Sequence, residues 1–472
     1  MAASRKKTLS SSNPLLPPDT KGALPVTLVT KKGLPEWLSG QPAARRKWLE
    51  TTGFTADPAQ VALYPAANGA LGGVVVGTED ELNMWSLASL PASLPQATYR
   101  LDGKFTPETA QQLLLGWALG SYRYTEYMKQ APRPLPALVA PKNADLVSVN
   151  EMAAAIKLVR DLINRPANDL GTDELAAAGI AVAKRFGAKS RVLRGEELLE
   201  KNYPAIYEVG KASPRPPQLL DFTWGKAEHP KLTLVGKGVV FDTGGLHLKP
   251  GNSMNLMKKD MGGAAHVLAL ASLIMAAKLP VRLRVLVPMA ENSVAGNAFR
   301  PHDIIKTRGG LTVEVGSTDA EGRLLLVDAL AEGVTEKPDL IIDFATLTGS
   351  GWNAVGPHMG VFFGNDDGIN QALEAAAQTE SDPLWRFPLW QGYAKSMNGK
   401  ISDLSNTGSL GTAGAITAAL FIERFIPKGQ RWLHFDIRGW NESARPGRPE
   451  GGEAMGLRAM YRVIADRYGK AD

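Results

Sequence analysis

The feature that most constrains the fold is the alternation of apolar, strand-like runs with helical stretches from about residue 147 onward. Such alternation predicts an α/β domain with a mostly parallel central sheet that helices cover on both faces. In sheets of this kind the site lies beyond the carboxyl ends of the strands. Polar residues that follow a strand are therefore the first candidates for a site. The strand candidates are Leu232–Val235, Arg284–Val287, Thr312–Val315, Leu340–Phe344, Met359–Phe363 and Leu433–Ile437.

A second, smaller α/β segment precedes this domain. Its short apolar runs predict strands, its longer mixed runs predict helices, and a proline-rich stretch at 131–142 predicts a boundary. We therefore expect a flexible tail at 1–22, an N-terminal α/β domain at 23–145 and a larger C-terminal domain at 146–472. The predicted elements of the smaller domain are strands at Pro25–Val29, Val61–Tyr64 and Val74–Val76 and helices at Glu36–Thr51 and Pro107–Tyr124.

Composition narrows the classes of function. The chain has no cysteine, which excludes disulfides, thiolate nucleophiles and thiolate metal ligands. Its formal net charge of +6 comes from scattered basic residues and not from basic runs, so nucleic-acid and membrane-surface binding gain no support. No apolar run is long enough to cross a bilayer. We expect a cytoplasmic protein with no membrane partner.

The segment Ser317-Thr-Asp-Ala-Glu-Gly-Arg-Leu324 carries two carboxylates two residues apart, and an apolar helical run follows at once. In an extended segment, residues i and i+2 project to the same side, so Asp319 and Glu321 can face one point in space. Two like charges that close need a cation or a shared proton. The competing interpretation is a helix N-cap with a favourable acid in the first turn.

Further charged residues follow other predicted strands. Lys237 and Asp242 flank an apolar segment behind the strand at 232–235, and Lys249 comes shortly afterwards. Asp260 stands at the head of a small-residue helix that runs to about residue 277. The alternatives are a structural salt bridge between Lys237 and Asp242 and an N-cap at Asp260.

Four carboxylates that converge at one sheet edge are untenable without a metal. Oxygen ligands in a chain without cysteine favour a hard or borderline divalent ion. The sequence has neither HExxH nor GxSxG, and its six histidines lack ligand-like spacing, so we expect them in the core or at the surface.

Four segments of the sequence, in their order along the chain, resemble those of the leucyl (cytosolic) aminopeptidase family, the two-metal hexameric exopeptidases of the M17 type. The resemblance covers about residues 145–465, whereas the first 145 residues match the family only in domain size. It implies a metal-dependent aminopeptidase that releases N-terminal amino acids from peptides by attack of a metal-bridging hydroxide. The segments are Val235–Pro250, Lys259–Ala265, Thr318–Leu324 and Asp343–Gly349, with further likeness at Asn164–Leu170 and Trp432–Ile437.

The resemblance also implies which residues hold the two ions, for which manganese or zinc is expected. One ion would be held by Lys237, Asp242, Asp260 and Glu321, and the other by Asp242, Asp319 and Glu321. A lysine ligand must be a neutral amine, so the metal and burial would have to lower the pKa of Lys237.

Further roles follow from the same resemblance. Lys249 would stabilise the developing oxyanion, and Arg323 would hold a bicarbonate that shuttles protons. Leu347 would contact the substrate backbone. The side-chain pocket for the N-terminal residue would be lined by Met257, Thr346 and Gly349. The family also implies a homohexamer.

Two departures from the family pattern bear on specificity. Ser317 stands where asparagine is common. The strand end at Asp436 and Ile437 is commonly followed by small or apolar residues, but here Arg438-Gly-Trp-Asn441 follows. We expect Arg438 or Asn441 to make the pocket more polar than one built for leucine. The alternative places Arg438 at the solvent or at a subunit interface.

Two other functions compete with the aminopeptidase. A family-fold protein with a DNA-binding or regulatory role is compatible with the mild basic excess, although the sequence has no basic stripe. A catalytically inactive structural homologue is the third possibility. The presence of every ligand-type residue argues against it.

Overall fold

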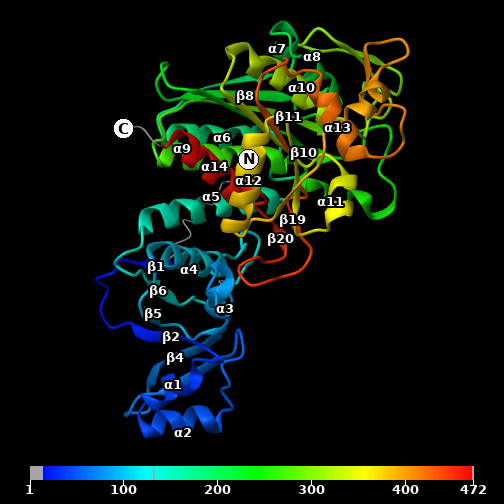
Figure 1. The fold of residues 1–472 in the computed structure, drawn as a ribbon. Coiled ribbons are helices and arrows are strands. Elements are labelled where there is room, and N and C mark those ends of the chain that lie inside the picture. The colour runs from blue at the N-terminus through cyan, green and yellow to red at the C-terminus, as the bar shows by residue number, and fades with distance from the viewer. Residues whose placement is uncertain (1–13, 131–132, 470–472) are drawn as a thin grey trace. The chain divides into compact units, whose positions relative to one another are not determined.

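The computed structural model describes residues 14–130 and 133–469 (Figure 1). The chain forms two compact units: one contains the residues up to Ala153 together with Ala444–Pro449, and the other contains Ala154–Ser443 and the chain from Glu450. Both units are α/β, as the sequence predicts, and the larger follows the smaller. The division lies inside helix α5 (Leu146–Asn164), whereas the sequence places it at 145. No helix of the described residues is long and apolar enough to cross a bilayer.

The smaller unit is built on a six-stranded sheet in the order β1-β6-β5-β2-β4-β3, parallel except for the pair β3 and β4. The expected tail is ordered where it is described, because Leu15 pairs with Leu138 and is 1% exposed; residues 1–13 of that tail lie outside the described residues. The elements are β1 (Leu15–Leu16), β2 (Leu24–Thr30), α1 (Leu34–Ser39), α2 (Ala43–Thr51), β3 (Val61–Pro65), β4 (Leu71–Thr78), η1 (Met84–Leu87), α3 (Leu90–Ser93), β5 (Thr98–Asp102), α4 (Pro107–Gly120) and β6 (Ala137–Val139).

The single helix expected at 36–51 is wrong. Two helices, α1 and α2, occupy this stretch because Gly40 caps the first and Pro42 precedes the second. Proline removes a backbone donor and fits only the first turn of a helix, so the chain restarts there.

A late segment of the chain completes the smaller unit. The guanidinium of Arg448 lies 4.0 Å from the centre of the Trp85 ring in η1, and Gly447 packs against the same indole. The sequence carries no signal for this return of residues 444–449.

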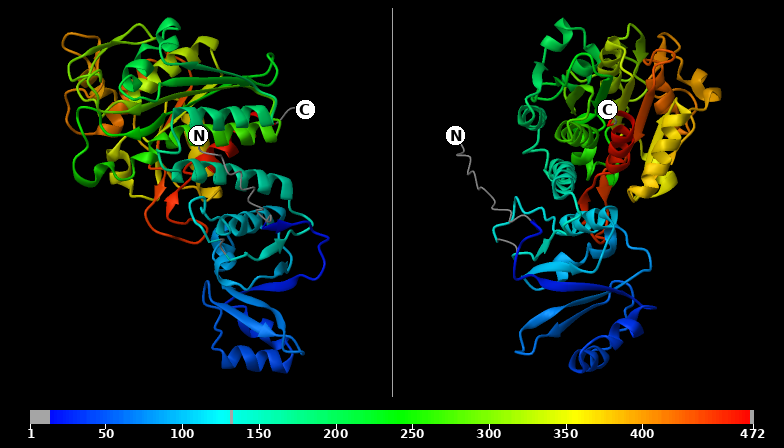
Figure 2. Two further views of the ribbon diagram at one scale, coloured as in Figure 1. Left: turned by 180° about the vertical axis from the view of Figure 1, so that it is seen from behind. Right: turned by 60° about the vertical axis from the view of Figure 1, so that its left-hand side comes forward.

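The larger unit is built on a nine-stranded sheet (Figures 1 and 2), in the order β16-β15-β18-β14-β9-β11-β8-β7 with β10 paired to β11. Most neighbours are parallel, and the antiparallel pairs lie toward the two edges, as the sequence predicts for the fold class. The strands are β7 (Lys189–Arg194), β8 (Gln218–Trp224), β9 (Lys231–Gly236), β10 (Gly238–Asp242), β11 (Arg282–Asn292), β14 (Leu340–Ala345), β15 (Gly360–Gly364), β16 (Leu384–Arg386) and β18 (Trp432–Asp436).

The predicted strand at 312–315 does not belong to this sheet. It forms β13 (Thr312–Glu314) of a separate three-stranded sheet with β12 (Ile304–Lys306) and β17 (Leu404–Ser405). The strand is where the sequence predicts it, but periodicity identifies a strand and not its partners. A further pair, β19 (Trp440–Asn441) and β20 (Gly451–Gly452), forms a two-stranded sheet.

Helices cover both faces of the nine-stranded sheet (Figure 1). One face carries α6, α9, α12 and α14, and the other carries α8, α10 and α13, whose apolar residues join one buried cluster with the strands. The helices and short turns are α6 (Thr172–Arg185), α7 (Glu197–Glu200), α8 (Pro204–Gly210), η2 (Gly251–Met254), η3 (Met257–Met261), α9 (Gly262–Ala276), α10 (Gly322–Gly333), η4 (Val334–Glu336), α11 (Gly349–Val355), α12 (Asp367–Thr379), η5 (Gln391–Met397), α13 (Gly414–Glu423) and α14 (Leu457–Tyr468).

Lys237 interrupts the sheet between β9 and β10. Its N–H donates to the carbonyl of Phe344 in β14 (3.0 Å), and its carbonyl accepts from the N–H of Ala264 in α9 (2.8 Å). Helix α9 approaches this closely because residue 263 is glycine: a Cβ there would lie 2.0 Å from the Phe344 carbonyl oxygen. The close approach fixes the backbone of Lys237 at the carboxyl end of the sheet.

Helix α9 also buries His266 completely. Its Nδ1 lies 2.7 Å from the Gly262 carbonyl and its Nε2 accepts from the N–H of Met455 (2.9 Å), which is the pattern of a neutral ring. Burial lowers the pKa of His266 to about 4.

We predict that His266 makes the larger unit sensitive to acid. Its folded pKa of about 4 lies below the ordinary value of 6.5, so the unfolded chain takes up a proton first as the pH falls. The ring therefore stabilises the fold above pH 6.5, and this stabilisation is lost between pH 6.5 and 4. His266→Gln should reduce the loss of unfolding free energy between pH 7 and pH 5 by about 2 kcal/mol, measured by urea denaturation. An unchanged loss in His266→Gln would contradict the assignment.

Candidate active site

A cavity of about 420 Å³ lies in the larger unit at the carboxyl ends of its central strands. The structure brings eleven of the site residues predicted from the sequence to the wall of this cavity, although they come from four separate stretches of the chain. They are Lys237, Asp242, Lys249, Met257, Asp260, Asp319, Glu321, Arg323, Thr346, Leu347 and Gly349.

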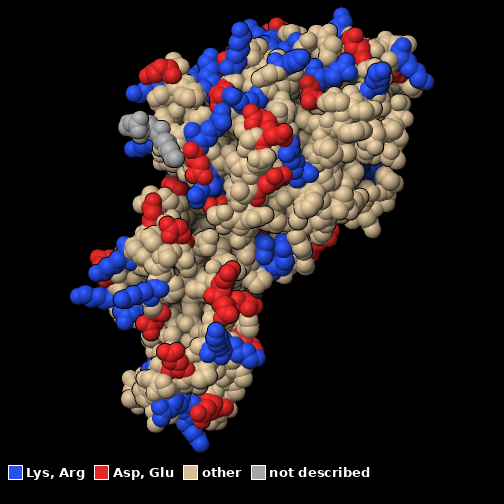
Figure 3. Space-filling model, viewed as in Figure 1, with Lys and Arg blue, Asp and Glu red and all other residues tan. Residues whose placement is uncertain are grey.

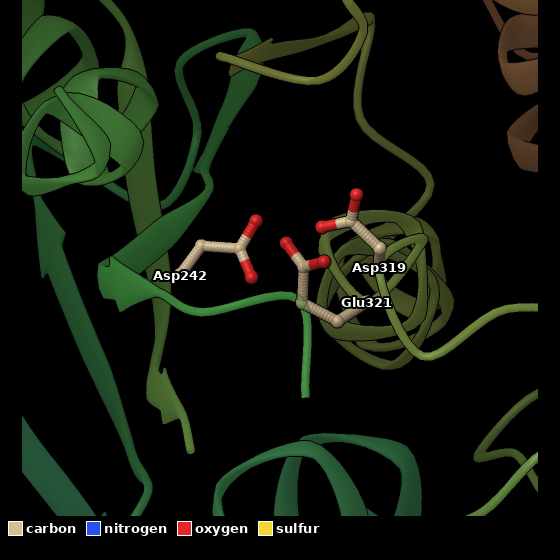
Figure 4. A group of neighbouring side chains, drawn as sticks. All are labelled: Asp242, Asp319 and Glu321. Carbon is tan, nitrogen blue, oxygen red and sulfur yellow. The ribbon is translucent and has the colours of Figure 1, made fainter. Parts of the chain in front are cut away.

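Three carboxylates converge in the cavity (Figure 4). Asp242 ends β10, Asp319 lies in the loop before α10, and Glu321 precedes the first residue of α10. One oxygen from each of the three lies within 4.8 Å of the others. The N-cap interpretation is wrong for these side chains, because Glu321 occupies the N-cap position but makes no capping hydrogen bond.

The fourth acid, Asp260, lies in η3 and not at the head of α9, whose N-cap is Met261. Its side chain is buried and accepts from the hydroxyl of Thr346 (2.9 Å). The predicted N-cap at Asp260 is therefore also wrong.

Lys237 lies beneath the carboxylates and is 2% exposed. Its ammonium contacts Asp260 (2.7 Å) and Glu321 (3.3 Å) and donates to the carbonyl of Thr346 (2.8 Å). The alternative pairing with Asp242 is wrong, since Asp242 pairs with Lys249. Burial lowers the pKa of Lys237, but the surrounding carboxylates outweigh burial and raise it overall. The protein groups alone thus do not lower this pKa, and the neutral amine expected for a ligand would need the metal as well as burial.

Lys249 joins two of the acids from the solvent side. Its ammonium lies 2.8 Å from Asp242 and 2.5 Å from Asp319. Burial lowers the pKa of Lys249, but these two carboxylates raise it well above its ordinary value. Lys249 therefore carries its positive charge into the cavity at neutral pH.

The acids repel one another despite the two lysines. Burial and the charge of Asp242 raise the pKa of Glu321 to about 8, with Lys237 opposing the shift. The same two causes raise the pKa of Asp319 to about 6. The buried Oε2 of Glu321 has no hydrogen-bond partner, which is costly for a carboxylate.

This donor set fits divalent metal ions. Converging carboxylate oxygens, one of them buried without a donor, are the ligands that hard and borderline cations prefer. A cation between them would replace the repulsion among the acids by attraction.

Supporting residues that the sequence analysis missed hold the acids in place. Asn292 ends β11 and donates to Asp242 (2.8 Å) and to the carbonyl of Thr318 (3.1 Å). Asn406 accepts from the N–H groups of Gly316 and Ser317 and donates back to this loop. Asn292 lies at the end of a strand, so the rule that selected the acids could also have identified it. Nothing in the sequence links Asn406 to a loop 86 residues or more away.

Ser317 has a local role in the same loop. Its hydroxyl accepts from the N–H of Asp319 (3.1 Å), so this departure from the family pattern turns the backbone that carries the acid.

No histidine is among the described residues that line the cavity. His434 is buried in strand β18 and pairs with Asp343 of β14 (2.5 Å), which also accepts from Trp432 (2.7 Å). His266 is in the core, as described above. The expectation of core or surface histidines agrees with these positions.

Arg438 and Asn441, the two residues expected to make the pocket more polar, lie in different environments in the structure. Arg438 lines the cavity, is 5% exposed and stacks on Trp352, so its placement at the solvent is wrong. Asn441 is fully buried and donates to Glu453 (2.8 Å), and it is not part of the cavity wall. Of the two, only Arg438 therefore lines the cavity.

Together these features define a two-unit α/β enzyme whose cavity is lined by carboxylates and lysines. The family model described as the cytosol aminopeptidase family, catalytic domain, matches residues 157–461, and the model described as the M17 aminopeptidase, N-terminal domain, matches residues 24–141. The chain belongs to the cytosol aminopeptidase family, a family of metal-dependent hydrolases that act on peptides. The resemblance inferred from the sequence segments is thereby confirmed.

Known proteins resemble the chain along most of its length. A probable cytosol aminopeptidase of Syntrophotalea carbinolica is 38% identical over 80% of this chain and 77% of the relative. The crystal structure of the cytosol aminopeptidase from Coxiella burnetii is 44% identical, with a TM-score of 0.93, and covers 97% of this chain and 100% of its own. The bottromycin maturation enzyme BotP in complex with Mn is 30% identical, with a TM-score of 0.84, over 94% of this chain and 99% of its own.

We predict that Gly322 is needed for activity more than for stability. A Cβ at this position would lie 2.3 Å from Cε of Lys237, so Gly322→Ala must displace the buried lysine from the acids. Aminopeptidase activity should fall by at least about tenfold while the melting temperature changes little, because the displaced atoms end a flexible side chain. Gly296→Ala, where nothing lies within 4 Å of the new Cβ, is the matched control and should behave as wild type. Full activity of Gly322→Ala would show that the position of Lys237 is unimportant.

Proposed function

We propose that the cavity removes N-terminal residues from peptides with the help of two divalent ions, manganese or zinc. The observation that carries this proposal is the convergence of Asp242, Asp319 and Glu321 within 4.8 Å around a buried carboxylate oxygen that has no donor. A divalent cation among these carboxylates would replace their mutual repulsion by attraction.

The residues proposed to hold the ions are those that surround this point. Lys237, Asp242, Asp260 and Glu321 would hold one ion, and Asp242, Asp319 and Glu321 would hold the other. When bound, the pair would activate a water as nucleophile, polarise the scissile carbonyl and bind the free α-amino group of the substrate. Lys237 must give up its proton to serve as a ligand.

Lys249 supplies the charge that the reaction needs at the carbonyl oxygen. Asp242 and Asp319 hold it at the cavity wall as an ammonium. A fixed positive charge in a partly buried site stabilises the oxyanion that develops as the carbonyl is attacked.

Arg323 is proposed to hold a bicarbonate that moves protons. The side chain is buried at the cavity and donates to the carbonyl of Asn406 (2.5 Å), while its Nε has no hydrogen-bond partner. Burial lowers the pKa of Arg323 to about 10, so the guanidinium remains charged at neutral pH and attracts an anion.

Substrate contacts are proposed along the neighbouring wall. The N–H of Leu347 donates to Asp436 (3.0 Å), so a contact with the substrate backbone must use the Leu347 carbonyl. Met257, Thr346 and Gly349 would line the pocket for the side chain of the N-terminal residue, since all three face the same cavity.

The family implies that six copies of the chain assemble into a hexamer, and the "cytosol" in the relatives' names supports the cytoplasm as its location. The alternative of DNA binding or regulation gains no support. Basic and acidic side chains are interspersed on the face of the larger unit shown in Figure 3, without a basic stripe.

We predict that activity depends on metal bound by Glu321. Chelation should abolish hydrolysis of a leucine chromogenic amide, and manganese or zinc should restore it. Glu321→Gln keeps the shape of the side chain but removes its charge, so both the metal content per subunit and the rate should fall. The exposed Glu228→Gln is the control for loss of one charge. Unchanged metal content in Glu321→Gln would contradict the ligand assignment.

We predict that Lys249 acts on the rate and not on substrate affinity. Lys249→Met should lower kcat by about 10²–10³-fold with little change in KM, because the oxyanion forms only in the transition state. The exposed Lys226→Met should have wild-type kinetics. A rise in KM with unchanged kcat would instead assign Lys249 to ground-state binding.

A further inference from the structure

Arg438 is a buried cation at the wall of the cavity with hydrogen-bonding capacity left over. Its guanidinium carbon lies 3.7 Å from the centre of the Trp352 ring, and its Nη2 forms an ion pair with Glu442. Its Nε and Nη1 are buried and have no hydrogen-bond partner. A buried N–H group without an acceptor costs folding free energy. We therefore expect a bound ligand to supply the acceptor.

The surroundings of Arg438 fix where that acceptor enters. Arg438 follows the end of β18, and a Cβ on the next residue, Gly439, would lie 3.4 Å from Cγ2 of Thr346. Arg438, Trp352 and Thr346 all line the cavity. The guanidinium therefore belongs to the wall on which the side chain of a substrate's N-terminal residue is proposed to lie.

Two neighbours hold the guanidinium in a defined orientation. Trp352 stacks on its face, which is the contact that arginine makes best with an aromatic ring, and Glu442 occupies one of its edges. Glu442 is half exposed, with 52% of its side chain accessible, so it does not take up the donors that are buried. An arginine fixed in this way recognises a carboxylate with little loss of side-chain entropy.

We propose that Arg438 makes this enzyme selective for peptides that begin with aspartate or glutamate. The inference rests on the proposed function and specifies its substrate class. The carboxylate of the N-terminal residue accepts hydrogen bonds from the unused N–H groups of Arg438. Leucine at the same position leaves those donors buried and unpaired, and arginine places a second cation beside the first.

The first test compares kcat/KM of the manganese-loaded wild-type protein for Glu-, Asp-, Gln-, Leu- and Arg-linked chromogenic amides. The kcat/KM values of the Glu and Asp substrates should exceed those of the Leu and Arg substrates by at least about tenfold, which is the typical contribution of a charge-assisted hydrogen bond. Higher kcat/KM for Leu than for Glu and Asp would overturn the inference. Hydrolysis of none of the five by folded, metal-loaded protein would instead overturn the proposed function, and this inference with it.

The second test assigns the selectivity to Arg438. Arg438→Met should lower kcat/KM for the Glu substrate by about 10- to 100-fold and leave the Leu substrate unchanged or improved. The exposed Arg424→Met is the matched control and should retain the wild-type profile. An unchanged Glu-to-Leu ratio in Arg438→Met would overturn the inference.

A third measurement needs no variant and covers the case in which Arg438→Met does not fold. Free L-glutamate should inhibit hydrolysis of the Leu substrate by the wild-type enzyme at a concentration at least about tenfold lower than free L-leucine does. Stronger inhibition by leucine would overturn the inference.

Discussion

The mutual repulsion of buried acids is the constraint on which the rest of the larger unit depends. Asp242, Asp260 and Glu321 are each about 2–3% exposed, and burying such groups is unfavourable unless positive charge or strong donors accompany them. Two lysines on opposite sides of the acids compensate part of this charge, and Asn292 and Thr346 add neutral hydrogen-bond donors. The negative charge at the centre of the group remains uncompensated. The pKa of Glu321 is raised there, and one of its buried carboxylate oxygens has no hydrogen-bond partner.

This constraint extends into the backbone. To place Lys237 under the acids, the chain leaves β9, bonds to β14 and α9 instead, and resumes as β10. The side chain then has room only because Gly322 begins α10 without a Cβ, and the backbone approach of α9 requires Gly263. The two glycines are therefore consequences of placing a full-length lysine in the core. A Cβ at Gly322 would meet the side chain of Lys237, and a Cβ at Gly263 would meet the backbone of β14.

Much of the site was predictable because strand ends are easy to find in a sequence. The apolar runs located β9, β14 and β18, and the rule that sites lie at carboxyl ends selected Lys237, Asp242 and Thr346 from among many polar residues. Pairing within the site was not predictable in this way. Lys237 pairs with Asp260 and not with the nearer-in-sequence Asp242, because the acid that faces a lysine is set by tertiary packing and not by sequence separation.

The fold was predictable at the level of class and less so at the level of partners. The strand at 312–315 was found, but its place in a separate three-stranded sheet was not predictable, since hydrogen-bond partners depend on tertiary contacts that periodicity does not record. Arg438 and Asn441 show the same limit: both are polar residues three positions apart after one strand, yet one faces the cavity and the other Glu453.

The return of residues 444–449 to the smaller unit has a consequence for the order of events during synthesis. The indole of Trp85 precedes the larger unit in the chain, but its cation partner Arg448 follows all nine strands of that unit's sheet. The smaller unit therefore cannot reach its final packing on the ribosome until all nine strands of the larger unit's sheet have been synthesised. A single cut in the chain likewise cannot free either unit whole.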